Sequence, residues 1–320
     1  MRESQAIQRL RRIATSPAAL GLADDTALLD GLVLTHDSIA EGVHFLPLDP
    51  PASVGWKLVA VNLSDLAAKG ATPAGALLSL TLSGDSEWEA QFLTGIEAAC
   101  ESYGLPLIGG DTIALPEDAP RVLGLTVIGR AGDHVPHRAG AKAGDRLWLV
   151  GTLGDSSAGL AQLQTDRHAT GPLVDVYRRP VPQLDAGQKL APHAHAMMDV
   201  SDGLLLDAQR MAEASGCTAM IELDRLPLSG DFVAARGDSR DARLFAATGG
   251  DDYALLGAFA ADFDPSTLNL PKGTTITAIG SLEAGEPEIR LTSNGEPVEL
   301  PERLGHEHRG LSTAPMADRP

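Results

Sequence analysis

Cysteine is almost missing from this 320-residue sequence, which contains only Cys100 and Cys217. Two cysteines in separate patterns do not make the disulfide framework of small secreted domains, so we expect unpaired thiols and a reducing compartment. Long apolar runs are missing too, because no window approaches about 18 uncharged apolar residues. The first 16 residues are partly basic but have no apolar central run. These absences predict a cytoplasmic protein with neither a signal peptide nor a membrane span.

Basic and aromatic residues are scarce. The chain has 25 Lys and Arg against 43 Asp and Glu, which gives a formal net charge of −18. Such a charge repels nucleic acid phosphates and anionic membrane surfaces, so neither is an expected partner. A phosphate ligand would need cations to bring it in. Aromatic residues make up 4% of the chain and hydrophobic residues 43%, which predicts an aliphatic core.

Several catalytic motifs are also absent. The sequence has no Walker-type Gly-Lys-Ser/Thr loop, no GxGxxG, no GxSxG nucleophile turn and no HExxH zinc motif. These absences disfavour P-loop NTPases, dinucleotide-binding folds, acyl transfer and zinc chemistry. The turn in "VGTLGDSSAGL" has the strand, glycine and helix order of a phosphate-binding loop, although an ordinary strand-to-helix loop explains it better.

The length and the patterns predict two domains of the α/β class. A chain of 320 residues exceeds the roughly 250–300 at which single cores stop growing. Strand patterns alternate with helix patterns on both sides of "GDHVPHRAGAKAGD", residues 132–145, which is rich in Gly, Pro and charge and has no periodicity. We therefore place the boundary near residue 135, between domains 1–135 and 136–320.

Local signals predict most elements of these domains. In the first domain we expect strands at 32–35, 75–82, 105–112 and 121–130, a helix at 56–70 that Gly70 ends, and a helix from Ser86 to Tyr103. Ser86 begins the capping box "SEWE". In the second domain we expect strands at 145–151 and 217–223, helices at 158–164 and after 203, and a hairpin turning at Asn294 and Gly295.

Acidic residues end several apolar strands or lie on the polar edge of an apolar helix, beside small residues. They are Asp24, Asp25, Asp37, Asp65, Asp111, Asp199 and Asp202. Each one alone is explained as a turn or helix cap. If they converge, pairs about 4 Å apart repel by roughly 4 kcal/mol at an effective dielectric near 20, so a cation must lie among them. Mg²⁺ prefers such hard oxygen ligands and shares them with phosphates. Asp207 is expected on a helix surface.

The motifs, taken in order along the chain, resemble the thiamine-monophosphate kinase family. They are "DDTALL", "LTHDSIAEGVHF", "WKLVAVNLSDLAAKGATP", "LIGGDT", "HRAGAKAGD", "VGTLGDSSAGL", "MDVSDGLLLD" and "GGDDYALL", from about residue 20 to 260. The resemblance implies an N-terminal mixed sheet that forms a homodimer interface, a C-terminal α/β domain, and ATP in the cleft between them. It also implies transfer of the γ-phosphoryl group of ATP to thiamine monophosphate, which gives thiamine diphosphate.

The resemblance also implies roles for single residues. Side chains for several Mg²⁺ ions would come from Asp25, Thr35, Asp37, Asp65, Asp111, Asp199 and Asp202, with a backbone oxygen from His36. ATP would contact Gly110, Asp111, Arg138 and Ser201, and the thiamine phosphate would face His44 and Asp251. The resemblance leaves open whether K⁺ assists.

Some positions depart from the family pattern. Ala23 stands where the family shows Gly, His36 where it shows a small residue, and Asp251 where it shows Glu, while "ERLGHEHRG" at 302–310 lacks the family's tail aromatics. Two alternatives stay open at this point. One is another ATP-using synthetase of the same superfamily, which includes aminoimidazole ribonucleotide synthetase. The other is a catalytically silent, acidic regulator that binds metal or nucleotide.

Overall fold

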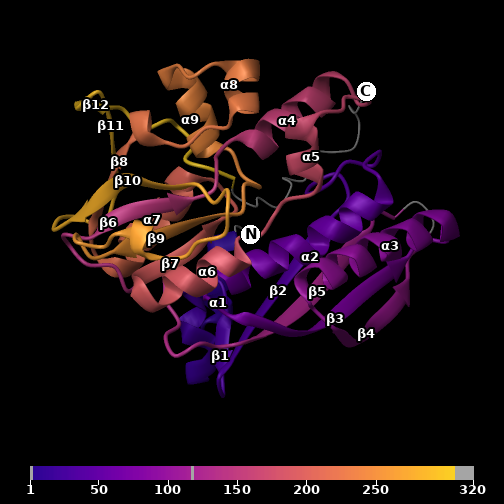
Figure 1. Cartoon of the computed structure of the whole chain (residues 1–320). Coiled ribbons are helices and arrows are strands. Elements are labelled where there is room, and N and C mark those ends of the chain that lie inside the picture. Colours follow the sequence, from indigo (N-terminus) through magenta and orange to yellow (C-terminus); the bar gives the residue numbers. More distant parts are fainter. Residues whose placement is uncertain (1–2, 117–118, 307–320) are drawn as a thin grey trace.

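Two sheets organise the chain, one in each half (Figure 1). The computed structural model describes residues 3–116 and 119–306. In the first half, the strands are β1 (Ala27–Leu29), β2 (Leu32–Ala40), β3 (Thr72–Leu82), β4 (Leu107–Ala114) and β5 (Val122–Arg130), and the helices are α1 (Glu3–Leu10), α2 (Pro51–Ala68) and α3 (Ser86–Tyr103). The sheet has the order β1-β2-β5-β3-β4, in which only β3 and β4 pair in parallel. The expected mixed sheet is therefore confirmed.

The second half contains a larger sheet with helices around it. Its strands are β6 (Arg146–Val150), β7 (Ala194–Val200), β8 (Thr218–Glu222), β9 (Ala254–Phe259), β10 (Ile276–Glu283), β11 (Ile289–Ser293) and β12 (Glu296–Val298). Its helices are α4 (Asp155–Thr165), α5 (Pro172–Arg178), α6 (Leu184–Leu190), α7 (Leu204–Ser215), α8 (Gly230–Arg236) and α9 (Arg240–Thr248). The strand order is β12-β11-β8-β10-β6-β9-β7. The hairpin β11–β12 turns at Asn294 and Gly295, which both have positive φ, as expected.

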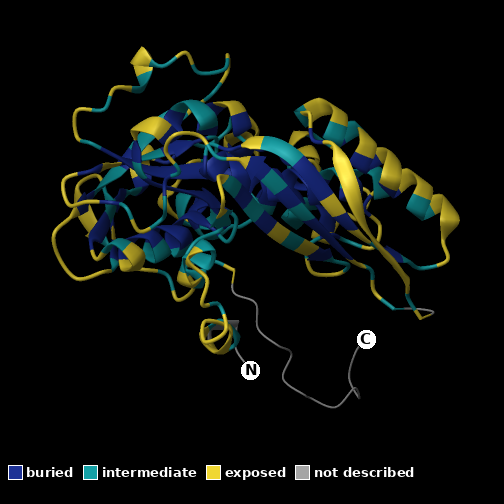
Figure 2. Cartoon of the chain, turned by 90° about the horizontal axis from the view of Figure 1, so that it is seen from below, coloured by how far each residue is buried: buried dark blue, intermediate teal, exposed yellow. Residues whose placement is uncertain are grey.

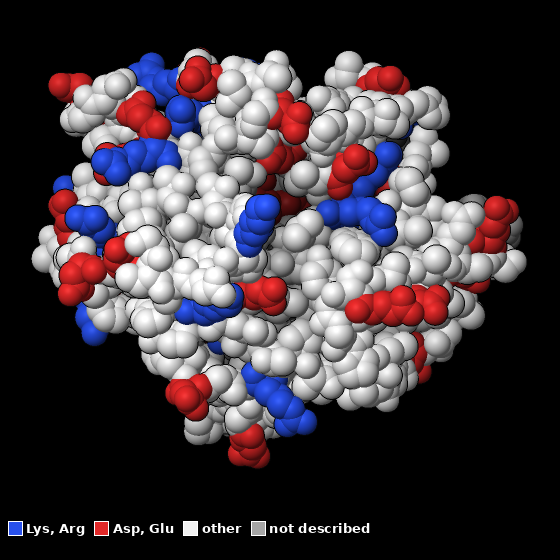
Figure 3. Space-filling model, viewed as in Figure 1, with Lys and Arg blue, Asp and Glu red and all other residues white. Residues whose placement is uncertain are grey.

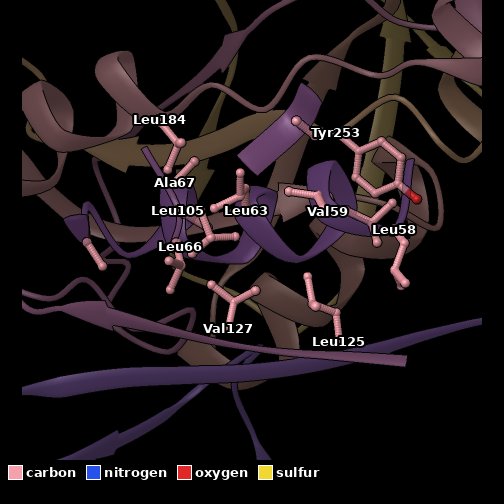
Figure 4. Packing of buried hydrophobic residues seen from close by; sticks show 14 of the residues in the cluster. Leu58, Val59, Leu63, Leu66, Ala67, Leu105, Leu125, Val127, Leu184 and Tyr253 are labelled. Carbon is pink, nitrogen blue, oxygen red and sulfur yellow. The ribbon is translucent and has the colours of Figure 1, made fainter. Parts of the chain in front are cut away.

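Helix α2 lies between the two halves. Figure 4 shows its leucines facing Leu125 and Val127 of β5 on one side, with Leu184 and Tyr253 of the second half on the other. The sequence pattern predicted one apolar and one polar face, but both faces are buried, since the sheet and α3 cover one and α6, β7 and β9 cover the other. This helix therefore carries any polar residue on its second face into the junction between the halves.

The ends of the two long helices test the local signals. Helix α2 ends before Gly70, whose φ of +61° suits the expected stop. Helix α3 ends at Gly104 as expected, but Ser86 is not its cap. Instead the Asp85 side chain accepts the N–H of Trp88, and Ser86 is the first helical residue. The two candidates are adjacent, and Asp is as good an N-cap as Ser, so the pattern alone did not separate them.

One face of the N-terminal sheet has no helix over it. Figure 2 looks onto this side of the sheet, where exposed and half-buried positions alternate with buried ones along the strands. Alternate residues of each strand point there, including Leu77 and Ser79 of β3, while their neighbours pack against α2 and α3. Every residue of β4 is exposed. The uncovered face includes the apolar side chain of Leu77, 40% exposed.

The sheets change between Arg130 and Arg146. The boundary that we expect near residue 135 falls in this connection and stays a prediction. Cys217 is buried and Cys100 is half-buried, and both thiols are free. None of the helices in residues 3–116 and 119–306 has the length and apolarity needed to cross a membrane.

Candidate active site

Two buried carboxylates and one partly buried carboxylate meet where the halves join. Oxygen atoms of Asp25, Asp65 and Asp199 all lie within 4.8 Å of one another. Asp25 comes from the loop before β1, Asp65 from the buried second face of α2, and Asp199 from near the end of β7. The convergence that the sequence predicted is therefore present for these three, and it brings together segments up to 174 residues apart in the chain.

Neighbouring hydroxyl and amide groups fix the carboxylates. Thr35 donates its hydroxyl hydrogen to Asp65, and Ser64 Oγ donates to Asp199 Oδ2 at 2.8 Å. The backbone N–H of Asp37 donates to Asn62 Oδ1 at 2.9 Å, so α2 also fixes the strand that carries Asp37. Residues 62, 64 and 65 lie on the same helix. A single turn of α2 therefore orients ligands from both halves.

Two cations cover one side of the cluster. Lys69 Nζ lies 2.6 Å from Asp24 Oδ1 and 3.2 Å from Asp25 Oδ2, and it also donates to the carbonyl of Met197 at 3.1 Å. Arg138 pairs with Asp25 through a guanidinium nitrogen. Burial alone would raise the pKa of Asp25, but these two cations outweigh it and lower that pKa. Asp24 thus serves in an ion pair rather than facing the cluster.

The other side of the cluster has no such compensation. Burial, together with the nearby carboxylates of Asp37 and Asp199, raises the pKa of Asp65 well above its ordinary value. Burial and the charge of Asp25 raise the pKa of Asp199 in the same way. Within the described residues, no ion pair reaches Asp65 or Asp199. A bound cation would favour the charged form of both groups.

The loop after β7 turns sharply at Gly203, which has a φ of +116°. A Cβ at this position would lie 2.9 Å from the carbonyl oxygen of Gly249, so only glycine fits. Asp202 in this loop pairs with Arg210 at 2.6 Å. Arg210 also holds Asp207 at 2.8 Å.

Asp207 corrects one expectation from the sequence. It is completely buried rather than on the surface of α7, and it accepts the backbone N–H of Asp202 at 3.2 Å. Burial raises its pKa to about 7, against the opposing effect of Arg210. Asp207 therefore supports the loop that carries Asp202, which the helical spacing alone did not reveal.

A pocket of about 390 Å³ opens over the cluster. Figure 3 shows acidic atoms at the base of a hollow near the middle of this face. Its lining includes eight of the residues singled out from the sequence: Asp25, Asp37, His44, Asp65, Asp199, Ser201, Asp202 and Asp251. Both halves contribute to this lining. Its volume lies within the usual range of about 300–1,000 Å³ for small-molecule sites.

Two predicted site residues, Gly110 and Asp111, lie elsewhere in the single chain, while His36, from which only a backbone oxygen is expected, lies on β2 between Thr35 and Asp37. The His36 side chain points to the uncovered sheet face, where its ring nitrogens lie 2.9 Å from Thr126 Oγ1 and 3.3 Å from Ser38 Oγ. Gly110 and Asp111 lie on the exposed edge strand β4. Asp111 on β4 lies level with Ser38 on β2, but three strand-to-strand steps away across the sheet. At the usual spacing between strands this distance is about 14 Å. One chain alone does not bring Gly110 and Asp111 to the cluster.

The turn between β6 and α4 already holds a carboxyl group. The N–H of Gly154 donates to both carboxylate oxygens of Asp252, at 2.9 and 3.0 Å. Burial raises the pKa of Asp252 well above its ordinary value. The ordinary-loop interpretation of "VGTLGDSSAGL" therefore fits better than a phosphate-binding loop, since a side chain of this chain occupies the helix N-terminus.

Beside Asp251, which lines the pocket, lies a buried lysine that sequence reasoning missed. Lys57 Nζ is 2.5 Å from Asp251 Oδ2 and 4.2 Å from the ring centre of Tyr177. Lys57 and Lys69 are both buried in or beside the apolar helix α2. A lysine inside an apolar helical run was the signal that could have drawn attention to them.

Comparisons with known proteins agree with this geometry. The models for AIR synthase related proteins match the chain, the N-terminal domain over residues 23–131 and the C-terminal domain over residues 142–258. The thiamine-monophosphate kinase of Salmonella typhimurium is 38% identical over 308 residues, which cover 90% of this chain and 91% of the relative. The chain belongs to the thiamine-monophosphate kinase family. The family member from Aquifex aeolicus is 34% identical over 276 residues, 83% of this chain and 87% of the relative.

Solved structures of this family match over nearly the whole chain. AaThiL complexed with AMPPCP and TMP matches with a TM-score of 0.81 and 32% identity, covering 95% of this chain and 97% of that one. Thiamine monophosphate kinase from Stenotrophomonas maltophilia matches with a TM-score of 0.73 and 35% identity, covering 92% of this chain and 96% of that one. The two-domain α/β fold implied by the sequence is thus confirmed.

Proposed function

We propose that this protein transfers the γ-phosphoryl group of ATP to the phosphate of thiamine monophosphate, which yields thiamine diphosphate and ADP. The observation that carries this proposal is the acidic cluster at the base of a pocket between the halves, in a chain of the thiamine-monophosphate kinase family. Phosphoryl transfer needs mainly positioning and charge neutralisation. The pocket offers both, and it requires no covalent nucleophile.

The cluster fits Mg²⁺. Its donors are hard carboxylate oxygens, and burial together with neighbouring carboxylates raises the pKa of Asp65 and of Asp199, which supports a cation at this place. Side chains of Asp25, Asp37, Asp65, Asp199 and Asp202 would hold the ions. The neighbouring Thr35 and the backbone oxygen of His36 would complete the set. When bound, Mg²⁺ neutralises the phosphate oxygens of both substrates.

The remaining pocket residues orient the two substrates. Arg138 and Ser201 contact the phosphates of ATP, and Arg138 does so from its position beside Asp25. His44 and Asp251 face thiamine monophosphate from opposite halves of the chain. Closing the pocket around both molecules brings the acceptor phosphate in line with the γ-phosphate, and this alignment supplies much of the rate.

The protein acts as a homodimer in this proposal. Two copies pair through the uncovered face of the N-terminal sheet, which contains the exposed side chain of Leu77 and the edge strand β4. Such pairing would bury the exposed apolar side chain of this face. Gly110 and Asp111, which are too far from the cluster of their own chain, then serve the ATP site of the second copy.

A screen of acceptors tests the proposal. Purified protein with Mg²⁺ and ATP is supplied with thiamine monophosphate, thiamine or no acceptor, and ADP and phosphorylated thiamine are measured. We expect ADP and thiamine diphosphate in equal amounts, only with thiamine monophosphate. Turnover of thiamine alone, or an absence of product with every acceptor, would contradict the proposal.

A further inference from the structure

The loop that carries Asp251 has a strained backbone. Asp251 and Tyr253 have φ values of +69° and +51°, a region that residues with side chains seldom adopt. The loop is held against the end of β7, because the N–H of Asp251 donates to Ser201 at 2.8 Å and that of Tyr253 to Val200 at 2.9 Å. Such strain persists only where the surroundings determine the conformation.

Two side chains fix the Asp251 carboxylate itself. Tyr253 Oη donates to Oδ1 at 2.8 Å, and Lys57 Nζ donates to Oδ2 at 2.5 Å. The Lys57 side chain is 3% exposed and that of Asp251 is 27% exposed. The lysine is therefore the buried anchor of the pair, and the carboxylate is the end that faces the pocket.

Lys57 connects three parts of the chain. It arises from α2, packs its ammonium over the ring of Tyr177 in α5, and reaches the loop before β9. A buried ammonium must be paired, so the position of Lys57 fixes that of its carboxylate partner. Within residues 3–116 and 119–306, Lys57 donates to one oxygen of Asp251 and Tyr253 to the other, and a carboxylate oxygen can accept two hydrogen bonds. One acceptor position per oxygen is thus left for a ligand.

We propose that Lys57 is a positioning residue, which holds the Asp251 carboxylate at the place where it receives the thiamine part of the acceptor. The inference rests on the proposed function and adds a specificity role for Lys57. Lys57 does not touch the phosphates or the metal ligands, since its contacts lie at the Asp251 end of the pocket. Its effect should therefore appear in acceptor binding and not in the transfer step.

Kinetics of Lys57→Met test this split. Methionine keeps the length and apolar stem of the side chain but removes the charge. We expect KM for thiamine monophosphate to rise about tenfold, the effect of losing one charge-assisted hydrogen bond, while kcat and KM for ATP change less than about twofold. Lys189→Met is the matched control, because Lys189 donates to the Asn269 carbonyl on the surface, and its constants should equal those of the wild type. An unchanged or lowered KM for thiamine monophosphate in Lys57→Met would overturn the proposal.

A double variant separates positioning from general damage. If Lys57 acts through Asp251, then Lys57→Met adds nothing to KM in an Asp251→Asn background. If it only supports the fold, its effect is added to that of Asp251→Asn, and the proposal is wrong.

Hydrogen exchange provides a readout that does not depend on the acceptor. Amides of residues 251–253 should exchange faster in Lys57→Met than in the wild type and in Lys189→Met, with protection of α2 unchanged. Amides 251–253 could exchange faster in Lys57→Met although the wild type phosphorylates no thiamine compound. That result would support the contact between Lys57 and Asp251 and refute only the kinase function. Unchanged exchange together with normal kinase activity would refute the anchor alone.

Discussion

At the scale of single residues, the main feature of the site is that several carboxyl groups lie close together. Asp25, Asp65 and Asp199 approach within 4.8 Å, where two charges repel by roughly 3–4 kcal/mol at an effective dielectric near 20. Lys69 and Arg138 offset the charge of Asp25 only. The uncompensated pair is costly in the absence of a cation, and this cost is the physical basis of the proposed Mg²⁺ dependence.

Replacing Asp65 by Asn tests this cost. Asparagine keeps the shape and removes the charge, so we expect turnover to fall by about a thousandfold or more, the loss typical of removing a group that stabilises transition-state charge. The metal-free protein should melt at the same temperature or about 2–4 °C higher, since a buried carboxylate with a raised pKa has been removed. Turnover and thermal unfolding are measured on the same sample.

Asp262→Asn is the control, because Asp262 is exposed in a turn. It should match the wild type in both measurements. A melting temperature that drops in Asp65→Asn while turnover survives would show that Asp65 supports the structure of α2 and does not hold the metal.

Local patterns found the acidic residues but not their partners. The acidic residues of the pocket stand at strand ends or beside small residues, and the sequence alone shows such positions. They are Asp25, Asp37, Asp65, Asp199 and Asp202. The roles of Lys57, Lys69 and Asp207 depend on burial by the other half of the chain. No local pattern encodes that burial, so these partners were missed.

At the scale of elements, α2 places polar side chains in the site, and the N-terminus of α4 binds a carboxyl group of the chain itself. The spacing of apolar residues predicted α2 as a helix with a second, polar face, and the structure packs this face on α6, β7 and β9. The tertiary arrangement, and not the helix pattern, thus turns Asn62 and Asp65 into site residues. At the N-terminus of α4, the Asp252 carboxyl group accepts the N–H of Gly154, in the turn that has the strand, glycine and helix order of a phosphate-binding loop.

The pH dependence of stability tests the role of Asp252. Burial raises its pKa in the folded state above the unfolded value of about 4, so the stability it contributes is complete below that value and is lost as the pH rises through the folded pKa. Asp252→Asn does not titrate, and its Oδ1 can still accept the N–H of Gly154. We therefore expect the wild type to lose stability relative to Asp252→Asn between pH 5 and pH 8, measured by thermal unfolding.

The same control applies to this series. Asp262→Asn should give a stability curve parallel to that of the wild type. If Asp252→Asn also runs parallel to the wild type, the carboxylate of Asp252 is not buried in solution as the structure places it.

At the scale of the whole molecule, the uncovered sheet face remains to be explained. The covered face supplies the core against α2 and α3, while the other face has Leu77 exposed beside the edge strand β4. The proposed pairing of two copies through this face would account for its exposed apolar side chain and for the distance of Asp111 from the cluster of its own chain.

Leu77→Asp should break this pairing. A charge placed at the centre of an apolar interface loses its water without gaining a partner, so the variant should sediment as a monomer while the wild type sediments as a dimer. Leu93→Asp is the matched control, since Leu93 is exposed to a similar extent, 42% against 40%, but lies on α3, away from the uncovered face. A wild-type protein that is monomeric at micromolar concentration would contradict the pairing.

Mg²⁺ should stabilise the folded molecule more at pH 8 than at pH 5. Protons compete for Asp65 and Asp199, whose pKa values are raised, so the metal-free protein loses stability as the pH rises and the ion restores it. The increase in melting temperature on adding Mg²⁺ measures this effect at each pH. In Asp65→Asn the increase should be smaller at pH 8, and an increase that is the same at both pH values would argue against binding at the cluster.

The most direct test of the account follows the phosphoryl group. ATP labelled at the γ-phosphate is incubated with the wild-type protein, Mg²⁺ and thiamine monophosphate, and the label is traced among the products. The account predicts that the label appears in thiamine diphosphate, with one ADP formed for each. Label found only in inorganic phosphate, with no thiamine diphosphate, would contradict it.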